Sequence, residues 1–201
     1  TTTTCDLVVR VGLGIGAELR VSEEGNAKVQ LEHVYSGARA ARFGLAVNLN
    51  VLSPMALVEA VLPAMKDAQS GSIVNVSSVA AVNTPTGMAH YAATKAALAK
   101  YSEALHVELR DHGIHVVTVY PGPVATPMEA RARETFGGSF GAADKLPMGT
   151  PEELALKINK AITAKTRKLY YPDFYRSAFM FPNLSQCLTE KFSPGLETLA
   201  S

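Results

Sequence analysis

Two β-branched runs that enclose a helix-forming stretch constrain the fold of this chain more than any other feature. The runs are Ser72 to Val76 and Ile114 to Tyr120, and the second is closed by Pro121 and Gly122. The stretch between them, Met88 to His112, is rich in Ala, Leu, Glu and Lys, with apolar residues at helical spacing. A strand–helix–strand crossover of this kind predicts two parallel strands in an open α/β sheet.

The residues that follow the two strands are the first candidates for function, because ligands of open α/β sheets bind beyond the carboxyl ends of the strands. They are Ser77 and Ser78 after the first strand, and Pro121 to Thr126 after the second. Taken alone, a serine in such a place is more often a turn residue or a helix cap than a catalytic group.

Tyr91 and Lys95 are four residues apart at the start of the predicted helix, so both side chains project from one face. An ammonium near a phenol favours the phenolate and lowers the phenol pKa from its ordinary value of about 10. Such a phenol suits general acid–base catalysis. Because a Tyr–Lys pair also arises by chance on helix surfaces, its position near Ser78 and the Pro-Gly turn carries the argument.

Taken together, these motifs resemble the short-chain dehydrogenase/reductase family. The matching elements are NVSS with Ser78, YAATK with Tyr91 and Lys95, and YPGPVAT ending at Thr126; upstream, AVNLN places Asn48 where the family has its fourth catalytic residue. The resemblance implies a doubly wound, Rossmann-like parallel sheet in a three-layer α/β/α arrangement. It implies a single domain over residues 1–201, with a catalytic core at 48–126 and a substrate lid at 127–150.

The resemblance also implies a role for each matching residue. Tyr91 exchanges the proton with the substrate oxygen, and Ser78 holds that oxygen. Lys95 lowers the pKa of Tyr91 and bonds the nicotinamide ribose, while Asn48 positions a water that passes protons to Lys95. Cofactor contacts are assigned to Tyr91, Lys95, Pro121, Gly122, Val124 and Thr126, the last two on the carboxamide.

The activity implied is that of an NAD(P)-dependent oxidoreductase that interconverts an alcohol and a ketone or aldehyde, with NADP slightly preferred over NAD. One alternative is a non-catalytic or truncated relative that keeps the fold for subunit association. Another is an epimerase or dehydratase relative, which also uses a Tyr-x-x-x-Lys pair; Ser78 and the Pro-Gly turn favour the reductase.

The N-terminal residues fit the family least well. The GLGIG stretch offers Gly12, Gly14, Ile15 and Gly16 as a loop on which a pyrophosphate rests, although the family's first two glycines are further apart and a plain turn is the simpler reading. In the favoured alignment, GIGAEL opens the first helix and residues 26–34 form the second strand. In the other alignment, residues 6–16 are the family's fourth strand and the glycine loop after it. Under both, residues 1–47 are an incomplete cofactor-binding part.

Other elements follow from local signals. Leu52 to Gln69 is predicted as a helix, and a further helix is expected to start at Thr150 and Pro151 and to end near Thr166. Lys168 to Tyr171 reads as an edge strand. The aromatic tail after it shows no clean period: it packs on the subunit or a dimer mate, lines a lipophilic substrate pocket, or leans on a membrane.

Composition limits the classes of partner. A net charge of +1 gives no reason to expect nucleic acid or an anionic membrane, and the five histidines show no metal-ligand spacing. Two cysteines, Cys5 and Cys187, indicate a reducing compartment, and we expect a cytoplasmic protein. No apolar run is long enough to predict a transmembrane helix, and no signal peptide is evident. The two helices at 52–69 and 88–112 resemble those that pair family subunits, so a homodimer or homotetramer is implied.

Overall fold

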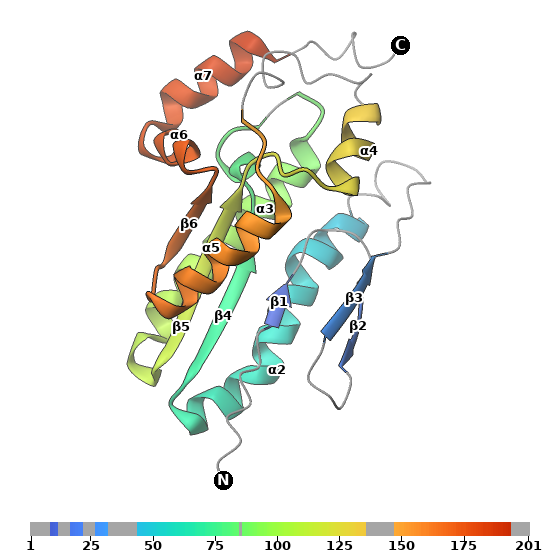
Figure 1. Ribbon diagram of the computed structural model, residues 1–201. Helices are drawn as coiled ribbons and strands as arrows, with labels where there is room; N and C mark the ends of the chain where they lie inside the picture. Colours follow the sequence, from blue (N-terminus) through green and yellow to red (C-terminus); the bar gives the residue numbers. More distant parts are fainter. Residues whose placement is uncertain are drawn as a thin grey trace.

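The computed structural model describes residues 9–11, 17–21, 27–31, 44–84, 86–135 and 147–193 (Figure 1). Its main sheet has four parallel strands in the order β1-β4-β5-β6. The strands are β1 (Val9–Val11), β4 (Gly71–Val76), β5 (Ile114–Pro121) and β6 (Lys168–Tyr171). This confirms the crossover predicted from the two β-branched runs, and β6 has the predicted bounds.

Alternation along the strands divides the core between the two faces of the sheet. All eight residues of β5 are buried, which explains why its sequence is mostly apolar and does not alternate between apolar and polar residues. Ile73 of β4 and its register partner Val116 belong to one apolar cluster, whereas the next pair, Val74 and Val117, belongs to another. The sheet is therefore covered on both sides.

One face is covered by α2 (Ser53–Ala68) and α3 (Ala89–Glu108). Buried residues of these helices pack on the sheet in a single cluster, which consists of Val58, Leu62, Met65, Ile73, Leu105, Leu109, Ile114 and Val116. The short helix η3 (Arg110–His112) follows α3, and Gly113 then takes a φ of 67°, a conformation that favours glycine. The predicted helix from 88 to 112 is thus confirmed.

The opposite face is covered by α5 (Pro151–Thr163), which lies in front of the sheet in Figure 1. Ala161 and its apolar neighbours on α5 pack against Val74, Val117 and Val119. Thr150 caps this helix by accepting a hydrogen bond from the Glu153 N–H, as the Thr-Pro-Glu-Glu order predicts. Helix, sheet and helix give the three-layer α/β/α arrangement that the sequence indicated.

The favoured alignment of the N-terminal residues is wrong in its helix, although a strand does lie within residues 26–34. Ala17–Val21 is not helical: it forms strand β2, which pairs antiparallel with β3 (Ala27–Leu31) in a separate two-stranded sheet. Both segments alternate apolar and polar residues with period two, and this pattern outweighs the glycine motif. Moreover, β1 lies directly beside β4, as in the alternative alignment. Residues 9–11 thus lie where the alternative alignment places the family's fourth strand.

The helix that includes α2 is longer than predicted. Helical structure runs from Gly44 to Ala68 and includes the π-helical turn η1 (Asn48–Leu52). Among the described residues, this one helix is long and apolar enough to cross a membrane, judged by length and composition alone. Its Val58, Leu62 and Met65 nevertheless pack on the sheet, as in a core helix. The expectation of no transmembrane segment stays a prediction.

The C-terminal residues form helices rather than an irregular tail. After α4 (Pro127–Thr135), which begins the segment predicted as a lid, and after β6, the chain forms η5 (Asp173–Tyr175), α6 (Arg176–Met180) and α7 (Pro182–Phe192). In Figure 1, α6 and α7 lie beyond the carboxyl ends of the strands. This is the end of the sheet at which the candidate site is found.

Candidate active site

Ser77 and Ser78 follow β4 and are both buried, but they make different contacts. The Ser77 hydroxyl donates to the Lys95 carbonyl at 2.8 Å, which joins the end of β4 to α3. The Ser78 hydroxyl accepts from the Ala80 N–H at 3.1 Å and so caps the short helix η2 (Val79–Ala81). It also donates to the Pro121 carbonyl at 3.4 Å. Ser78 is therefore a helix cap, which is the ordinary role of a serine after a strand. Its hydrogen bond to Pro121 also joins the end of β4 to the Pro121–Thr126 segment.

Lys95 is completely buried, which is unusual for a lysine. Its Nζ donates a hydrogen bond to the Val76 carbonyl at 3.0 Å, so the ammonium lies at the carboxyl end of β4. Burial disfavours the charged form and lowers the pKa of Lys95 to about 8. Such perturbed groups are concentrated at functional sites.

Tyr91 lies one helical turn before Lys95, in the first turns of α3, and is partly buried. The Lys95 Nζ is 5.7 Å from the centre of the Tyr91 ring. The sequence prediction that these two side chains share one face is thus confirmed. A buried cation beside a phenol that substrate can still reach is an arrangement that can exchange a proton with a bound alcohol or carbonyl oxygen.

The predicted Asn48 is an exposed residue of the π-helical turn η1, and its part in the site stays a prediction. Asn50, two residues on, is buried instead, and its Nδ2 donates to the Thr94 hydroxyl at 3.0 Å. That hydroxyl donates in turn to the Tyr91 carbonyl at 2.8 Å. Among the described residues, the Asn50 Oδ1 is buried without a hydrogen-bond partner, so it can accept a further bond.

Helical spacing alone would have pointed to Asn50. Asn50 precedes Pro54 by four residues, and Pro54, Val58 and Leu62 continue the same buried stripe at intervals of four. Asn48 is off this stripe. The family resemblance selects Asn48 from the neighbouring sequence, whereas the buried face of the helix selects Asn50. Both asparagines belong to the π-helical turn η1, a feature that often marks functional sites.

The Pro121–Thr126 segment lies at the end of β5 and is held by several contacts. The Gly122 N–H donates to the Tyr171 carbonyl at 2.7 Å, and a Cβ on Gly122 would collide with the Tyr175 ring. Glycine is therefore required here by packing. Val124 forms a parallel bridge with Gly149, and the Thr126 hydroxyl accepts from the Glu129 N–H at 3.2 Å at the start of α4.

The cofactor contacts predicted for Pro121, Gly122, Val124 and Thr126 stay predictions. The structure places this segment beside Ser78 through the Ser78–Pro121 hydrogen bond. Gly12, Gly14, Ile15 and Gly16 lie outside the described residues. Among the described residues, no three His, Cys, Asp or Glu side chains lie close enough together to hold a metal ion.

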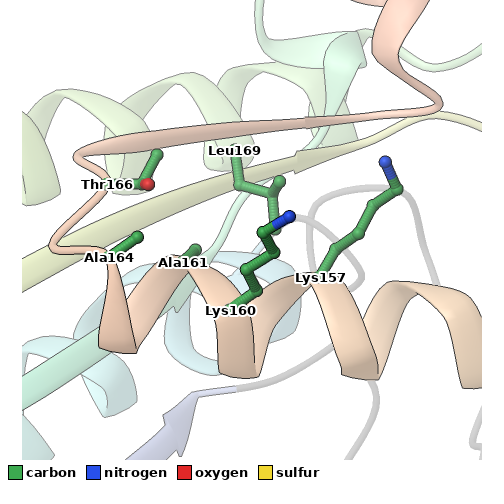
Figure 2. A pocket seen from close by; sticks show the side chains of 6 residues that line it. All are labelled: Lys157, Lys160, Ala161, Ala164, Thr166 and Leu169. Atoms are coloured by element: carbon green, nitrogen blue, oxygen red, sulfur yellow. The ribbon is translucent and has the colours of Figure 1, made fainter.

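A shallow cavity of about 170 Å³ lies away from this cluster, between α5 and β6 (Figure 2). It is lined by Lys157, Lys160, Ala161, Ala164, Thr166 and Leu169. Because α5 covers the sheet face opposite to α3, this cavity is separate from Tyr91 and Lys95. Lys157 is also paired with Asp173 at 2.9 Å.

Comparison with known proteins identifies relatives over the central part of the chain. "Dehydrogenase/reductase SDR family member 7B" of Danio rerio is 35% identical over 120 residues, which are 59% of this chain and 39% of the relative. "Uncharacterized oxidoreductase YbbO" of Escherichia coli K12 is 36% identical over 115 residues, 55% of this chain and 42% of the relative. "NADP-dependent 3-hydroxy acid dehydrogenase" of Schizosaccharomyces pombe is 36% identical over 124 residues, 59% and 46%. The chain thus spans less than half the length of these relatives.

Solved structures share the fold. A short-chain dehydrogenase from Burkholderia cenocepacia in complex with NADP has a TM-score of 0.64 at 22% identity, covering 79% of this chain and 64% of that one. A short-chain dehydrogenase from Sphingobium yanoikuyae in complex with NADPH has a TM-score of 0.61 at 25% identity, covering 79% and 60%. The family model described as "short chain dehydrogenase" matches residues 22–136, a span that holds Asn50, Ser78, Tyr91 and Lys95 and begins after the glycines of GLGIG. This match over more than half of the sequence shows that the chain belongs to the short-chain dehydrogenase/reductase family of oxidoreductases.

Proposed function

We propose that this chain supplies the catalytic centre of an NAD(P)-dependent oxidoreductase that interconverts an alcohol and a ketone or aldehyde. The observation that carries the proposal is the buried Lys95 ammonium, held at the end of β4 and 5.7 Å from the Tyr91 ring. A cation that is buried away from water is costly to keep. Its position is explained if it tunes the neighbouring phenol for proton transfer.

Each residue has a distinct part in the proposed reaction. Tyr91 gives a proton to the substrate oxygen in the reduction direction and takes it back in oxidation. Ser78 donates a hydrogen bond to the same oxygen, for which its hydroxyl must leave the long contact with the Pro121 carbonyl. Lys95 stabilises the Tyr91 phenolate. Asn50, rather than Asn48, holds the buried polar chain that ends at the Tyr91 backbone through Thr94.

The proposed cofactor is a nicotinamide dinucleotide, which supplies or accepts the hydride when bound. The chemistry of the residues fits it, since a buried ammonium and a loop at the ends of parallel strands suit a ribose and a carboxamide. We would test NADP first, because the S. pombe relative is named NADP-dependent and the Sphingobium structure holds NADPH.

Association of subunits through α2 and α3 is part of the proposal. Exposed apolar side chains remain on this helical face, among them Leu52 and Leu57 on the helix of residues 44–68 and Val107 on α3. Such side chains on neighbouring helices support pairing with a second copy.

The test is cofactor turnover by the Tyr91→Phe variant, with Tyr101→Phe on the same helix as the matched control. Loss of general acid–base catalysis lowers turnover by about 10²–10⁴-fold, whereas the control should keep the parent rate because Tyr101 lies more than two turns further along α3. Tyr91→Phe turnover within threefold of the parent would overturn the assignment.

A further inference from the structure

Helix α7 contacts the body of the protein through polar side chains. The Gln186 carbonyl oxygen accepts a hydrogen bond from the Thr84 N–H at 3.2 Å, and the Asn83 amide donates to the Ser185 hydroxyl. Ser185 and Gln186 are partly buried, as is Thr189 one turn later. An ordinary surface helix packs its apolar side on the protein. Helix α7 instead turns its polar side toward the protein.

The apolar side chains of α6 and α7 remain exposed as a result. They are spaced by three or four residues along α7 and therefore lie along one side of the helix. We call them the α6–α7 stripe, which consists of Met180, Phe181, Leu184, Leu188 and Phe192, each 47–63% exposed. Five large apolar side chains within this short segment exceed the scattered exposure that is normal for a protein surface.

The area of the stripe argues against a second copy of the chain as its occupant. With roughly 200 Å² for a full side chain, the exposed fractions amount to roughly 550 Å². A stable protein–protein interface of standard size buries about 800 Å² on each partner. The stripe is also a ridge along one helix. A ridge of this size can enter the boundary between headgroups and acyl chains, which is only about 5–10 Å deep for an interfacial helix.

The charges beside the stripe fit the same occupant. Lys191 lies next to Phe192, with its Nζ 5.8 Å from the ring centre, and Arg176 is exposed at the start of α6. Long cationic side chains of this kind reach back to the headgroup layer while their stems stay in the apolar region. Glu190 and Lys191 cancel within α7, so attraction to anionic lipid contributes little.

We propose that the α6–α7 stripe docks on the surface of a phospholipid bilayer. Asn83 and Thr84 follow η2, the helix that Ser78 caps, so docking would bring the lipid surface beside the candidate active site. The proposal concerns binding and does not depend on the proposed reaction. If the reaction is also correct, carbonyl compounds dissolved in the bilayer are the substrates best placed to reach Tyr91.

The test is flotation of the protein with phosphatidylcholine vesicles. The parent protein should float with the vesicles, and adding anionic phosphatidylglycerol should change its bound fraction little. Leu184→Ser should lower the bound fraction, whereas Leu156→Ser should not, because Leu156 is a 69% exposed leucine on α5, away from the stripe. The triple variant Phe181→Ser/Leu184→Ser/Leu188→Ser should lose at least roughly tenfold in partition coefficient.

A second measurement does not rely on these variants. Cys187 is exposed on α7, so a polarity-sensitive dye placed there in a Cys5→Ser background should report a less polar environment when vesicles are added. No flotation, or equal flotation by the parent and triple variants, would overturn the proposal. A third outcome would also overturn it. If the parent forms concentration-dependent dimers that the triple variant does not form, and vesicles leave the dye signal unchanged, the stripe binds a second copy of the chain.

Discussion

Lys95 is placed where a structural residue would be unfavourable. An ammonium that is 0% exposed loses its hydration, and the hydrogen bond to the Val76 carbonyl offsets only part of that cost. The same loss of hydration lowers the pKa of Lys95 to about 8. The proposed catalytic role of Lys95 therefore comes at a cost in stability, and the two effects can be measured separately.

The Lys95→Met variant should be more stable than the parent at neutral pH and yet inactive. In the parent, the folded state binds fewer protons than the unfolded state between pH about 8 and pH 10.5, so its free energy of unfolding rises across this window. The shift corresponds to an advantage for Lys95→Met of at most about 3 kcal/mol at pH 7, and the advantage disappears above the window. Urea unfolding of both proteins at several pH values measures this difference. A less stable variant would contradict the burial argument.

Asn50 and Asn48 give a matched pair of substitutions two residues apart. Asn50→Ala removes the hydrogen bond to Thr94 near the Tyr91 backbone, so turnover should fall at least tenfold. Asn48→Ala changes an exposed side chain and should leave turnover within about twofold. Steady-state kinetics of the two variants measures the two losses of turnover. A larger loss for Asn48→Ala than for Asn50→Ala would support Asn48 as the catalytic asparagine instead.

At the scale of elements, prediction from sequence succeeds where local and tertiary signals agree. The segment from Gly71 to Gly122 is predicted almost to the residue, because buried strands and a long helix with clear stop signals leave little choice. It fails for Ala17–Val21, where a glycine motif was weighed above strict alternation. The helices α6 and α7 are missed because no single period runs through the whole segment after β6, although Leu184, Leu188 and Phe192 keep helical spacing within it.

The contact between α3, β5 and the loop before β6 should weaken in mild acid. His106 on α3 and His115 on β5 meet edge to face with ring centres 6.3 Å apart, and the His115 Nε2 lies 3.1 Å from the Thr166 carbonyl. Burial lowers the pKa of both rings; Arg167 adds to the effect at His106, as Lys165 does at His115, and hydrogen bonds to the Val116 and Thr166 backbone partly oppose it.

Because both histidines bind protons more readily in the unfolded state, the free energy of unfolding should fall as the pH drops below about 6.5. Thermal midpoints at pH about 7.5 and pH about 5.5 measure the loss. The His115→Gln variant keeps a donor for the Thr166 carbonyl and should lose less on acidification. An equal loss in both proteins would remove this histidine as the cause.

At the scale of the whole molecule, the strand order determines which parts of a bound dinucleotide the sheet can contact. The proposed nicotinamide side is built on β4 and β5, where Ser78, Lys95 and the segment after Pro121 meet. In doubly wound sheets, the adenosine side depends on strands beyond the crevice. Within the described residues, the sheet has only the three-residue strand β1 on that side of β4, and β2 and β3 form a sheet of their own.

The 201-residue chain by itself should therefore bind NADPH and NADH more weakly than the micromolar range. Calorimetric titration on protein of verified mass measures the affinity, and Lys95→Met should weaken it further. Micromolar binding by this chain would show that residues 1–47 form a complete phosphate-binding part.

The most direct test of the proposed chemistry is isotope transfer, which tolerates weak cofactor binding. The protein is incubated with saturating NADPH that carries deuterium at the transferable position and with a panel of aliphatic and aromatic ketones and aldehydes; the alcohols are then analysed by mass spectrometry. We expect an alcohol with one deuterium on its carbinol carbon, formed by the parent and by Tyr101→Phe and almost absent with Tyr91→Phe. Equal deuterium transfer by Tyr91→Phe, or none by the parent with any carbonyl compound, would contradict the proposed chemistry.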